Sequence, residues 1–183
     1  SVAAASGVHL PRPPSGGAVP SGVAARACGV SASPGRPAAV FGSLARAALL
    51  TAFGLHGVPA SILDKAGPLS ESESERMRMH AYYTERMLAR PPALARLGAI
   101  AALTHERCDG SGYHRGLAGS AIPVTGRLLA AACAYRAMSE PRSHRPAWMA
   151  HQVTAQLVGD VLAGHLDPHA VTHHPPAAAQ RPG

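Results

Sequence analysis

Apolar residues along this chain repeat mostly with the period of an α-helix. The first repeat covers residues 38–53, and its apolar positions are Val40, Leu44, Ala48 and Leu49. Gly54 and Gly57 then interrupt the pattern, which predicts the end of a helix. Similar stretches predict further helices over 93–103, 124–138 and 147–166.

A capped helix is predicted over residues 71–89. Ser70 and Glu73 match the capping-box pattern, and acidic residues in the first turn complement the positive end of a helix dipole. The predicted inward face carries Met77, His80, Thr84 and Met87. We therefore expect the His80 side chain to point into the protein rather than into solvent.

Composition favours helices over sheets. Only 4% of the residues are aromatic although 46% are hydrophobic, so the core consists mainly of alanine and aliphatic side chains, which suit packed helices. A length of 183 residues supports one domain. We predict an all-α fold with one helical domain at 38–174, a disordered low-complexity segment at 1–37 and a Pro/Ala-rich tail at 175–183.

The chain is basic and its positive charge comes mainly from arginine. It has 17 basic and 10 acidic residues, a formal net charge of +7, and Lys65 as its one lysine. Arginine suits phosphate oxygens, so this excess favours an anionic ligand such as a nucleotide. A GC-rich coding sequence would also produce an excess of arginine. No basic stretch interleaved with aromatic residues stands out, and we do not expect nucleic-acid binding.

The cysteines and the lengths of the apolar runs indicate the compartment. Cys28, Cys108 and Cys133 are far apart, and this spacing favours neither a disulfide framework nor a zinc knuckle. No apolar run reaches the roughly 18 residues of a membrane span. We therefore expect a cytoplasmic protein that does not associate with a membrane.

A glycine-spaced loop follows His105 and Glu106, between two predicted helices. Glycine adopts positive φ and lets the backbone approach a ligand closely, while an imidazole can bind a metal ion. The residues expected to contact a ligand are Asp109, Gly110, Gly112 and Tyr113. A polar glycine loop is equally typical of a helix connection without a function.

Several segments resemble, in order and spacing, the HD-GYP domain family, a helical branch of the HD metal-dependent phosphohydrolases. The resemblance covers about residues 44–171, and the segments that carry it are His80, His105-Glu106, Asp109-Gly-Ser-Gly-Tyr-His114 and Arg127-Leu-Leu-Ala. It implies an HD-type helical bundle that holds two or three metal ions, often iron or manganese. It also implies hydrolysis of the bacterial signalling messenger cyclic di-GMP.

The resemblance also identifies ligand positions that this chain has lost. Thr51 and Ala52 stand where the family has its His-Asp pair, and Leu55 stands where the family has a lysine. Thr104 replaces the first of two adjacent histidines, and Cys133 replaces an aspartate. We therefore assign no catalytic residue and expect hydrolysis by the family mechanism to be impaired.

The remaining candidate ligands are assigned by the same resemblance. It maps His80, His105 and Cys133 to one cavity, and two imidazoles with a thiolate can hold a single divalent ion such as zinc, iron or manganese. Alternatively, Cys133 is a small buried residue, the histidines are satisfied by hydrogen bonds, and the cofactor is absent or weakly bound. Arg142 and Arg145 align with basic residues that meet phosphates in the family, or else lie in a solvated loop.

Two functional hypotheses follow. The first is a degenerate HD-GYP domain, a signalling pseudoenzyme that binds a cyclic dinucleotide, another phosphodiester or a protein partner. The alternative is an active metal-dependent phosphodiesterase that hydrolyses cyclic di-GMP, with His80, His105 and Cys133 as ligands and Arg142 and Arg145 holding phosphate. Some related proteins add a helix-turn-helix module, but residues 173–183 do not resemble one, so DNA binding is not expected of this chain.

Overall fold

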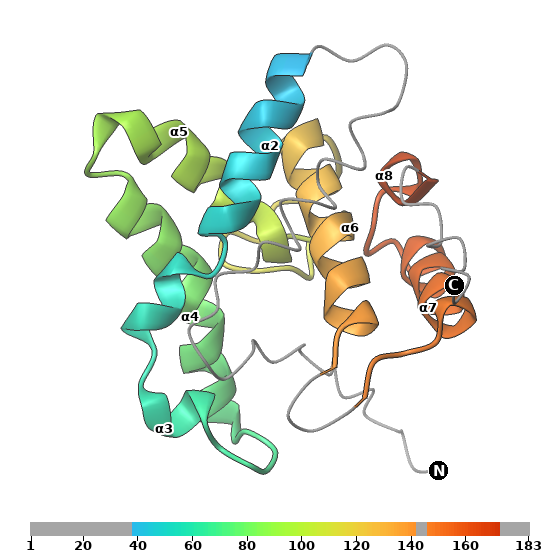
Figure 1. Cartoon of the computed structure of the whole chain (residues 1–183), viewed down its shortest axis with the longest axis horizontal. Coiled ribbons are helices and arrows are strands. Elements are labelled where there is room, and N and C mark those ends of the chain that lie inside the picture. Colours follow the sequence, from blue (N-terminus) through green and yellow to red (C-terminus); the bar gives the residue numbers. More distant parts are fainter. Residues whose placement is uncertain (1–37, 142–145, 173–183) are drawn as a thin grey trace, which may run out of the picture.

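The computed structural model describes residues 38–141 and 146–172, and this part of the chain is helical and contains no strand. The predictions for 1–37, for Arg142 and Arg145, and for the tail from 175 lie outside the described residues. The helices, drawn in Figure 1, are α2 (Ala38–Leu50), α3 (Ala60–Leu63), α4 (Glu71–Leu88), α5 (Pro92–Ala101), α6 (Val124–Ser139), α7 (Ala150–Leu162) and α8 (Pro168–Thr172). The predicted all-α fold is confirmed.

Three helix ends lie three or more residues from their predicted positions. The first helix ends at Leu50, because the chain turns there into a 3-10 helix, η2 (Phe53–Gly57). The predicted helix at 147–166 is shorter at both ends: the N-cap residue Met149 is extended, and Gly164 has a φ of +76° that ends α7. A left-handed glycine directly after a helix is a common stop signal.

Helix α4 begins at the predicted cap. Ser70 Oγ accepts a hydrogen bond from the Glu73 backbone N–H at 3.3 Å, and the Ser70 N–H donates to Glu73 Oε2 at 2.7 Å. Both halves of the capping box are therefore present, which satisfies two N–H groups that the first helical turn leaves unpaired. Lys65 pairs with the same carboxylate at 2.5 Å and lowers the pKa of Glu73 to about 2.

The predicted inward face of α4 is wrong at one position. Met77, His80 and Thr84 are buried, but Met87 is 38% exposed and Leu88 is buried in its place. Leu88 continues the four-residue step from Thr84, and Gly98 of α5 leaves room for it: a side chain on Gly98 would lie 2.5 Å from Leu88 Cβ. The position at which α5 crosses α4 therefore determines that Leu88, rather than Met87, is buried.

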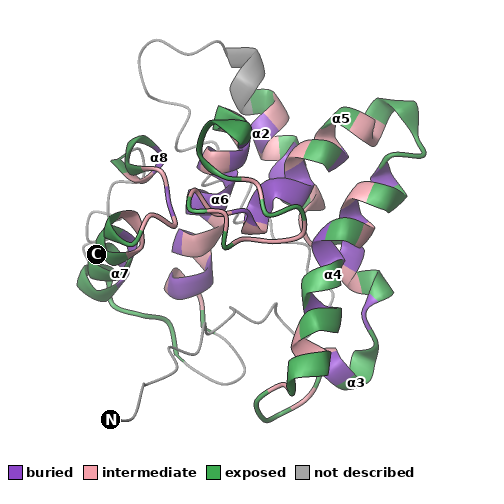
Figure 2. Cartoon of the chain, turned by 180° about the vertical axis from the view of Figure 1, so that it is seen from behind, coloured by how far each residue is buried: buried purple, intermediate pink, exposed green. Residues whose placement is uncertain are grey.

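Helix α6 is central to the core, as its apolar sequence predicted. Buried side chains of α2, α5 and α6 form one cluster, which includes Leu44, Ala101 and Leu129. A second cluster joins α6 to α7 through residues such as Tyr135 and Leu157. Figure 2 shows buried positions gathered along α6 and along the side of α4 that faces the other helices.

The turn after α2 packs directly on the backbone of α4. The Gly54 N–H donates to Thr84 Oγ1 at 2.9 Å, and the Thr84 hydroxyl donates to the His80 carbonyl oxygen at 3.0 Å. Gly54 has no side chain to separate the two backbones, so η2 approaches α4 closely. This contact places Thr51 and Ala52, which precede η2, beside the part of α4 that carries His80.

Candidate functional site

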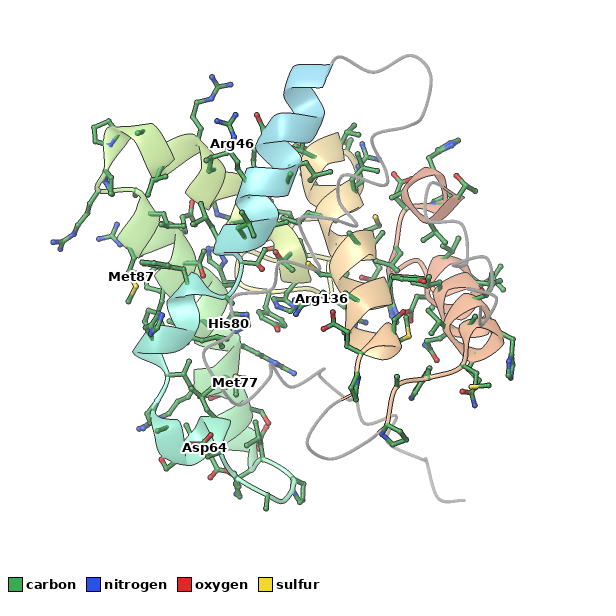
Figure 3. The ribbon with its side chains drawn as sticks, viewed as in Figure 1. Arg46, Asp64, Met77, His80, Met87 and Arg136 are labelled. Atoms are coloured by element: carbon green, nitrogen blue, oxygen red, sulfur yellow. The ribbon has the colours of Figure 1, made fainter. Side chains whose placement is uncertain are left out.

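Three aromatic rings from different elements meet beside the glycine loop. His80 comes from α4, His105 ends the 3-10 helix η3 (Ala102–His105), and Tyr113 lies in the loop. The two histidine rings are 4.8 Å apart between centroids at an angle of 80°, and His105 stacks on Tyr113 at 4.8 Å with the planes 8° apart. Figure 3 shows His80 on the inner side of α4. The fold thus joins segments that are distant in the sequence.

Both imidazoles are in an environment that favours their neutral form. Desolvation lowers the pKa of His80, although a 2.6 Å hydrogen bond from its Nδ1 to the Met77 carbonyl oxygen opposes the shift. Desolvation lowers the pKa of His105 further, and the nearby His80 and Arg107 add to this effect. Burial also raises the pKa of Tyr113. All three rings are therefore uncharged at neutral pH.

The lowered pKa values predict a loss of stability in mild acid. Below the usual histidine pKa of about 6.5, the unfolded chain binds more protons than the folded protein does, so the stabilisation present above that pH disappears as the pH falls. We expect the free energy of unfolding to decrease between about pH 7 and pH 5. Denaturant titrations across this range measure it.

The control separates the ring cluster from other histidines. His105→Phe keeps an aromatic ring that does not titrate and is expected to flatten the pH dependence, whereas His151→Phe, at an exposed position on α7, is expected to keep it. An unchanged slope in His105→Phe would show that these imidazoles do not cause the acid sensitivity.

At three positions where the resemblance implies a lost metal ligand, the side chains make other contacts. The Thr51 hydroxyl donates to the Ala48 carbonyl oxygen at 3.0 Å, and the Thr104 hydroxyl donates to that of Ala101 at 2.6 Å. Cys133 packs against the α2–α5–α6 cluster, and burial raises the pKa of its thiol to about 12. Burial therefore disfavours the thiolate, which is the form of cysteine that binds metal ions.

These donors do not fit the multi-metal centre that the family resemblance implies. Among residues 38–141 and 146–172, no group of three or more histidine, cysteine, aspartate or glutamate side chains is arranged so that it could hold a metal ion. A bridged centre also needs carboxylates to balance the charge of its ions. A single ion held by His80, His105 and Cys133 stays a prediction, for which metal analysis is the test.

Glu106 holds the two ends of the glycine loop together. Its side chain is buried, and its two oxygens accept hydrogen bonds from the backbone N–H groups of Arg115 and Leu117, each at 2.8 Å. Gly112 lies directly over this residue, where an added Cβ would be 2.6 Å from Glu106 Cα. The sequence did not predict this role, because the partners are backbone groups that any residue provides.

Asp109 shapes the turn of the loop. Its Oδ1 accepts hydrogen bonds from the Ser111 backbone N–H at 2.9 Å and from the Ser111 hydroxyl at 2.8 Å, next to Gly110 at a φ of +83°. Asp109 Oδ2 lies 3.6 Å from His165 Nε2, in the segment between α7 and α8. This predicted ligand-contacting residue thus has a local structural role and also an ionic contact with the C-terminal helices.

Glu85 of α4 is a second anchor of the loop. Its carboxylate accepts hydrogen bonds from His114 Nε2 at 2.9 Å and from the Arg115 guanidinium. His114 stands where the resembled family has proline, so a hydrogen bond to α4 provides a restraint that proline would provide through its ring. Glu85 could not be predicted as an anchor, because its two partners are 29 and 30 residues away in the chain.

A model of the HD domain family matches residues 22–170 of this chain. The chain belongs to the HD domain family. It is 40% identical over 125 residues to the 3'3'-cGAMP-specific phosphodiesterase 3 of Vibrio cholerae, covering 68% of this chain and 27% of that protein. It is 35% identical over 135 residues to a cyclic di-GMP phosphodiesterase of Vibrio cholerae, covering 70% and 27%.

A third relative comes from another organism, Thermotoga maritima. The chain is 43% identical over 101 residues to the cyclic di-GMP phosphodiesterase of Thermotoga maritima, covering 54% of this chain and 27% of that protein. The chain therefore spans about a quarter of the length of these relatives. Within the described residues of this HD domain, no helix is both long enough and apolar enough to cross a membrane.

Proposed function

We propose that this HD domain binds a cyclic dinucleotide or a related phosphodiester and does not hydrolyse it by a metal-dependent route. Its relatives are phosphodiesterases of cyclic di-GMP and 3'3'-cGAMP. The glycine loop that carries much of the family resemblance is present and anchored at Glu106 and Glu85. An anchored loop loses little conformational entropy when it binds a ligand.

The proposal rests on one observation: few side chains near His80 can bind a metal ion. Metal-assisted hydrolysis needs an ion held firmly enough to lower the pKa of bound water and to neutralise phosphoryl oxygens. Two imidazoles and a buried thiol include no carboxylate to balance the charge of an ion, and Thr51 and Thr104 direct their hydroxyls at backbone carbonyl oxygens. Water at this site would therefore remain a weak nucleophile.

Two arginines beside the ring cluster provide charge for a phosphate. The Arg78 guanidinium carbon lies 5.9 Å from the centre of the Tyr113 ring, and the charge of Arg107 is close enough to lower the pKa of His105. The Arg78 side chain is exposed and Arg107 is half-buried, so both can turn toward a ligand. A charge-assisted arginine–phosphate bond is among the stronger polar contacts.

Titration calorimetry and turnover on the same preparation test the proposal. We expect saturable heat with cyclic di-GMP or 3'3'-cGAMP, and no hydrolysis above a protein-free control when Mn²⁺ or Fe²⁺ is added. Arg107→Ala is expected to weaken binding about tenfold or more, the value of one charged hydrogen bond. Arg46→Ala, on the outer surface of α2, is the matched control and should bind normally.

Two results would contradict the proposal. If neither dinucleotide produced heat or a thermal shift, the proposed binding would be wrong. Hydrolysis that disappears in His105→Ala would instead establish the alternative, a working phosphodiesterase, and metal analysis of that preparation would identify its ion.

A further inference from the structure

The outer face of α4 carries a groove on the side away from the ring cluster. It has a volume of about 500 Å³, and we call it the basic groove; its lining residues are Tyr83, Arg86, Met87, Ala89 and Arg90. The buried face of α4 carries His80 and Thr84, and Figure 3 shows Met87 at the outer edge of the molecule, away from His80. The basic groove is therefore separate from the site proposed above.

The groove combines two cations with an apolar wall. Arg86, near the end of α4, and Arg90, two residues after it, are exposed, and neither forms an ion pair or a side-chain hydrogen bond with another described residue. Between them, Met87 is 38% exposed, and Tyr83 is half-buried beside it. Methionine adapts its shape to different apolar partners. The surface is thus suited to a ligand with both carboxylates and an apolar side chain.

This chain has no acidic residue placed to neutralise the groove. Four of its 10 acidic residues pair with a lysine or an arginine, namely Glu73, Glu85, Glu140 and Asp167, and Asp109 and Asp160 each lie within 4 Å of His165. Glu106 is buried in the glycine loop. The others are Asp64, Glu71 and Glu75, and they precede or begin α4, whereas the groove lies at its end.

The segments outside the described residues do not supply an acid either. Residues 1–37, 142–145 and 173–183 contain no aspartate and no glutamate in the sequence. The 183 residues of this sequence therefore provide no complementary carboxylate at the groove. Only two cations line the groove, far fewer than the roughly six to ten phosphate contacts typical of a nucleic-acid interface.

We propose that the basic groove docks an acidic polypeptide segment that does not belong to this chain. Arg86 and Arg90 would each hold a carboxylate, and an apolar side chain of the segment would lie against Met87 and Tyr83. Arginine binds carboxylates through two parallel N–H bonds, which fixes the orientation of the segment as well as its affinity. The interaction is independent of dinucleotide binding.

Fluorescence anisotropy with a short labelled peptide of alternating glutamate and leucine tests the proposal on the full chain. We expect saturable binding that weakens as salt is added, because the contacts are exposed ion pairs. The double variant Arg86→Glu/Arg90→Glu is expected to weaken binding about tenfold or more. Peptides with glutamine for glutamate, or with serine for leucine, should each bind more weakly.

The matched control carries the same change in net charge elsewhere. Arg46→Glu/Arg96→Glu alters two exposed arginines of α2 and α5 that do not line the groove, and it should keep most of the affinity. Arg86→Gln/Arg90→Gln provides a milder variant, and circular dichroism checks that each protein is folded. An equal loss in both charge-reversed variants would overturn the proposal. So would binding to vesicles of phosphatidylserine and phosphatidylcholine without binding to the peptide.

Discussion

Gly54→Ala is expected to lower the free energy of unfolding by about 3 kcal/mol or more, which would leave much of the protein unfolded at moderate temperature. A Cβ at this position would lie 1.9 Å from the His80 carbonyl oxygen and 2.5 Å from the Thr84 backbone nitrogen. Both atoms belong to the backbone of α4, so no side chain can rotate away. Urea denaturation followed by circular dichroism measures the loss.

The control for this substitution is a glycine at which an added Cβ would have open space around it. At Gly159 of α7 an added Cβ would meet nothing within 4 Å. There alanine is expected to be neutral or to stabilise the helix by about 0.5 to 1 kcal/mol, because glycine is a poor helix former. If Gly54→Ala and Gly159→Ala had the same stability, the close packing of η2 on α4 would be refuted.

The result would also give a structural reason for a glycine at position 54. Thr51 and Ala52, which stand where the resembled family has its His-Asp pair, lie directly before the turn that carries Gly54. The Gly54 hydrogen bond to Thr84 holds η2 against α4. The packing of η2 on α4 therefore requires a glycine independently of the chemistry of the residues before it.

The helices could be predicted because their signals are local. The capping box at Ser70, the apolar repeat of α6 and the glycines after α2 act within a few residues, and the structure has all three. The position of Met87 could not be predicted, since the choice between Met87 and Leu88 depends on where α5 crosses. Periodicity identifies the buried face of a helix but not which neighbour covers its edge.

The candidate site was predictable only in part for the same reason. The meeting of His80 and His105 followed from the family resemblance, and the ring geometry is consistent with it. The anchors at Glu85 and Glu106 were missed because their partners are either distant in sequence or backbone N–H groups. The basic groove was missed because Arg86 and Arg90 stand out only once the pairing of the acidic residues is known.

Glu106→Ala is expected to detach the glycine loop and to lower the free energy of unfolding by about 2 to 4 kcal/mol. The substitution leaves the N–H groups of Arg115 and Leu117 without their acceptors, in a part of the loop that is only partly accessible to water. Denaturant titration measures the stability, and amide hydrogen exchange at Arg115 and Leu117 measures the loop directly. Dinucleotide binding should weaken in parallel.

Two further variants separate the geometry of this carboxylate from its charge. Glu106→Gln keeps the shape but has one acceptor oxygen, and its amide N–H group would face a second donor, so an intermediate loss is expected. Glu75→Ala removes the same charge from an exposed position on α4 and should leave amide exchange in the loop unchanged. Unaltered exchange at Arg115 and Leu117 in Glu106→Ala would mean that the loop keeps its conformation without this side chain. The anchoring role would then fall to Glu85, whose carboxylate is bonded by His114 and Arg115 and so links the loop to α4.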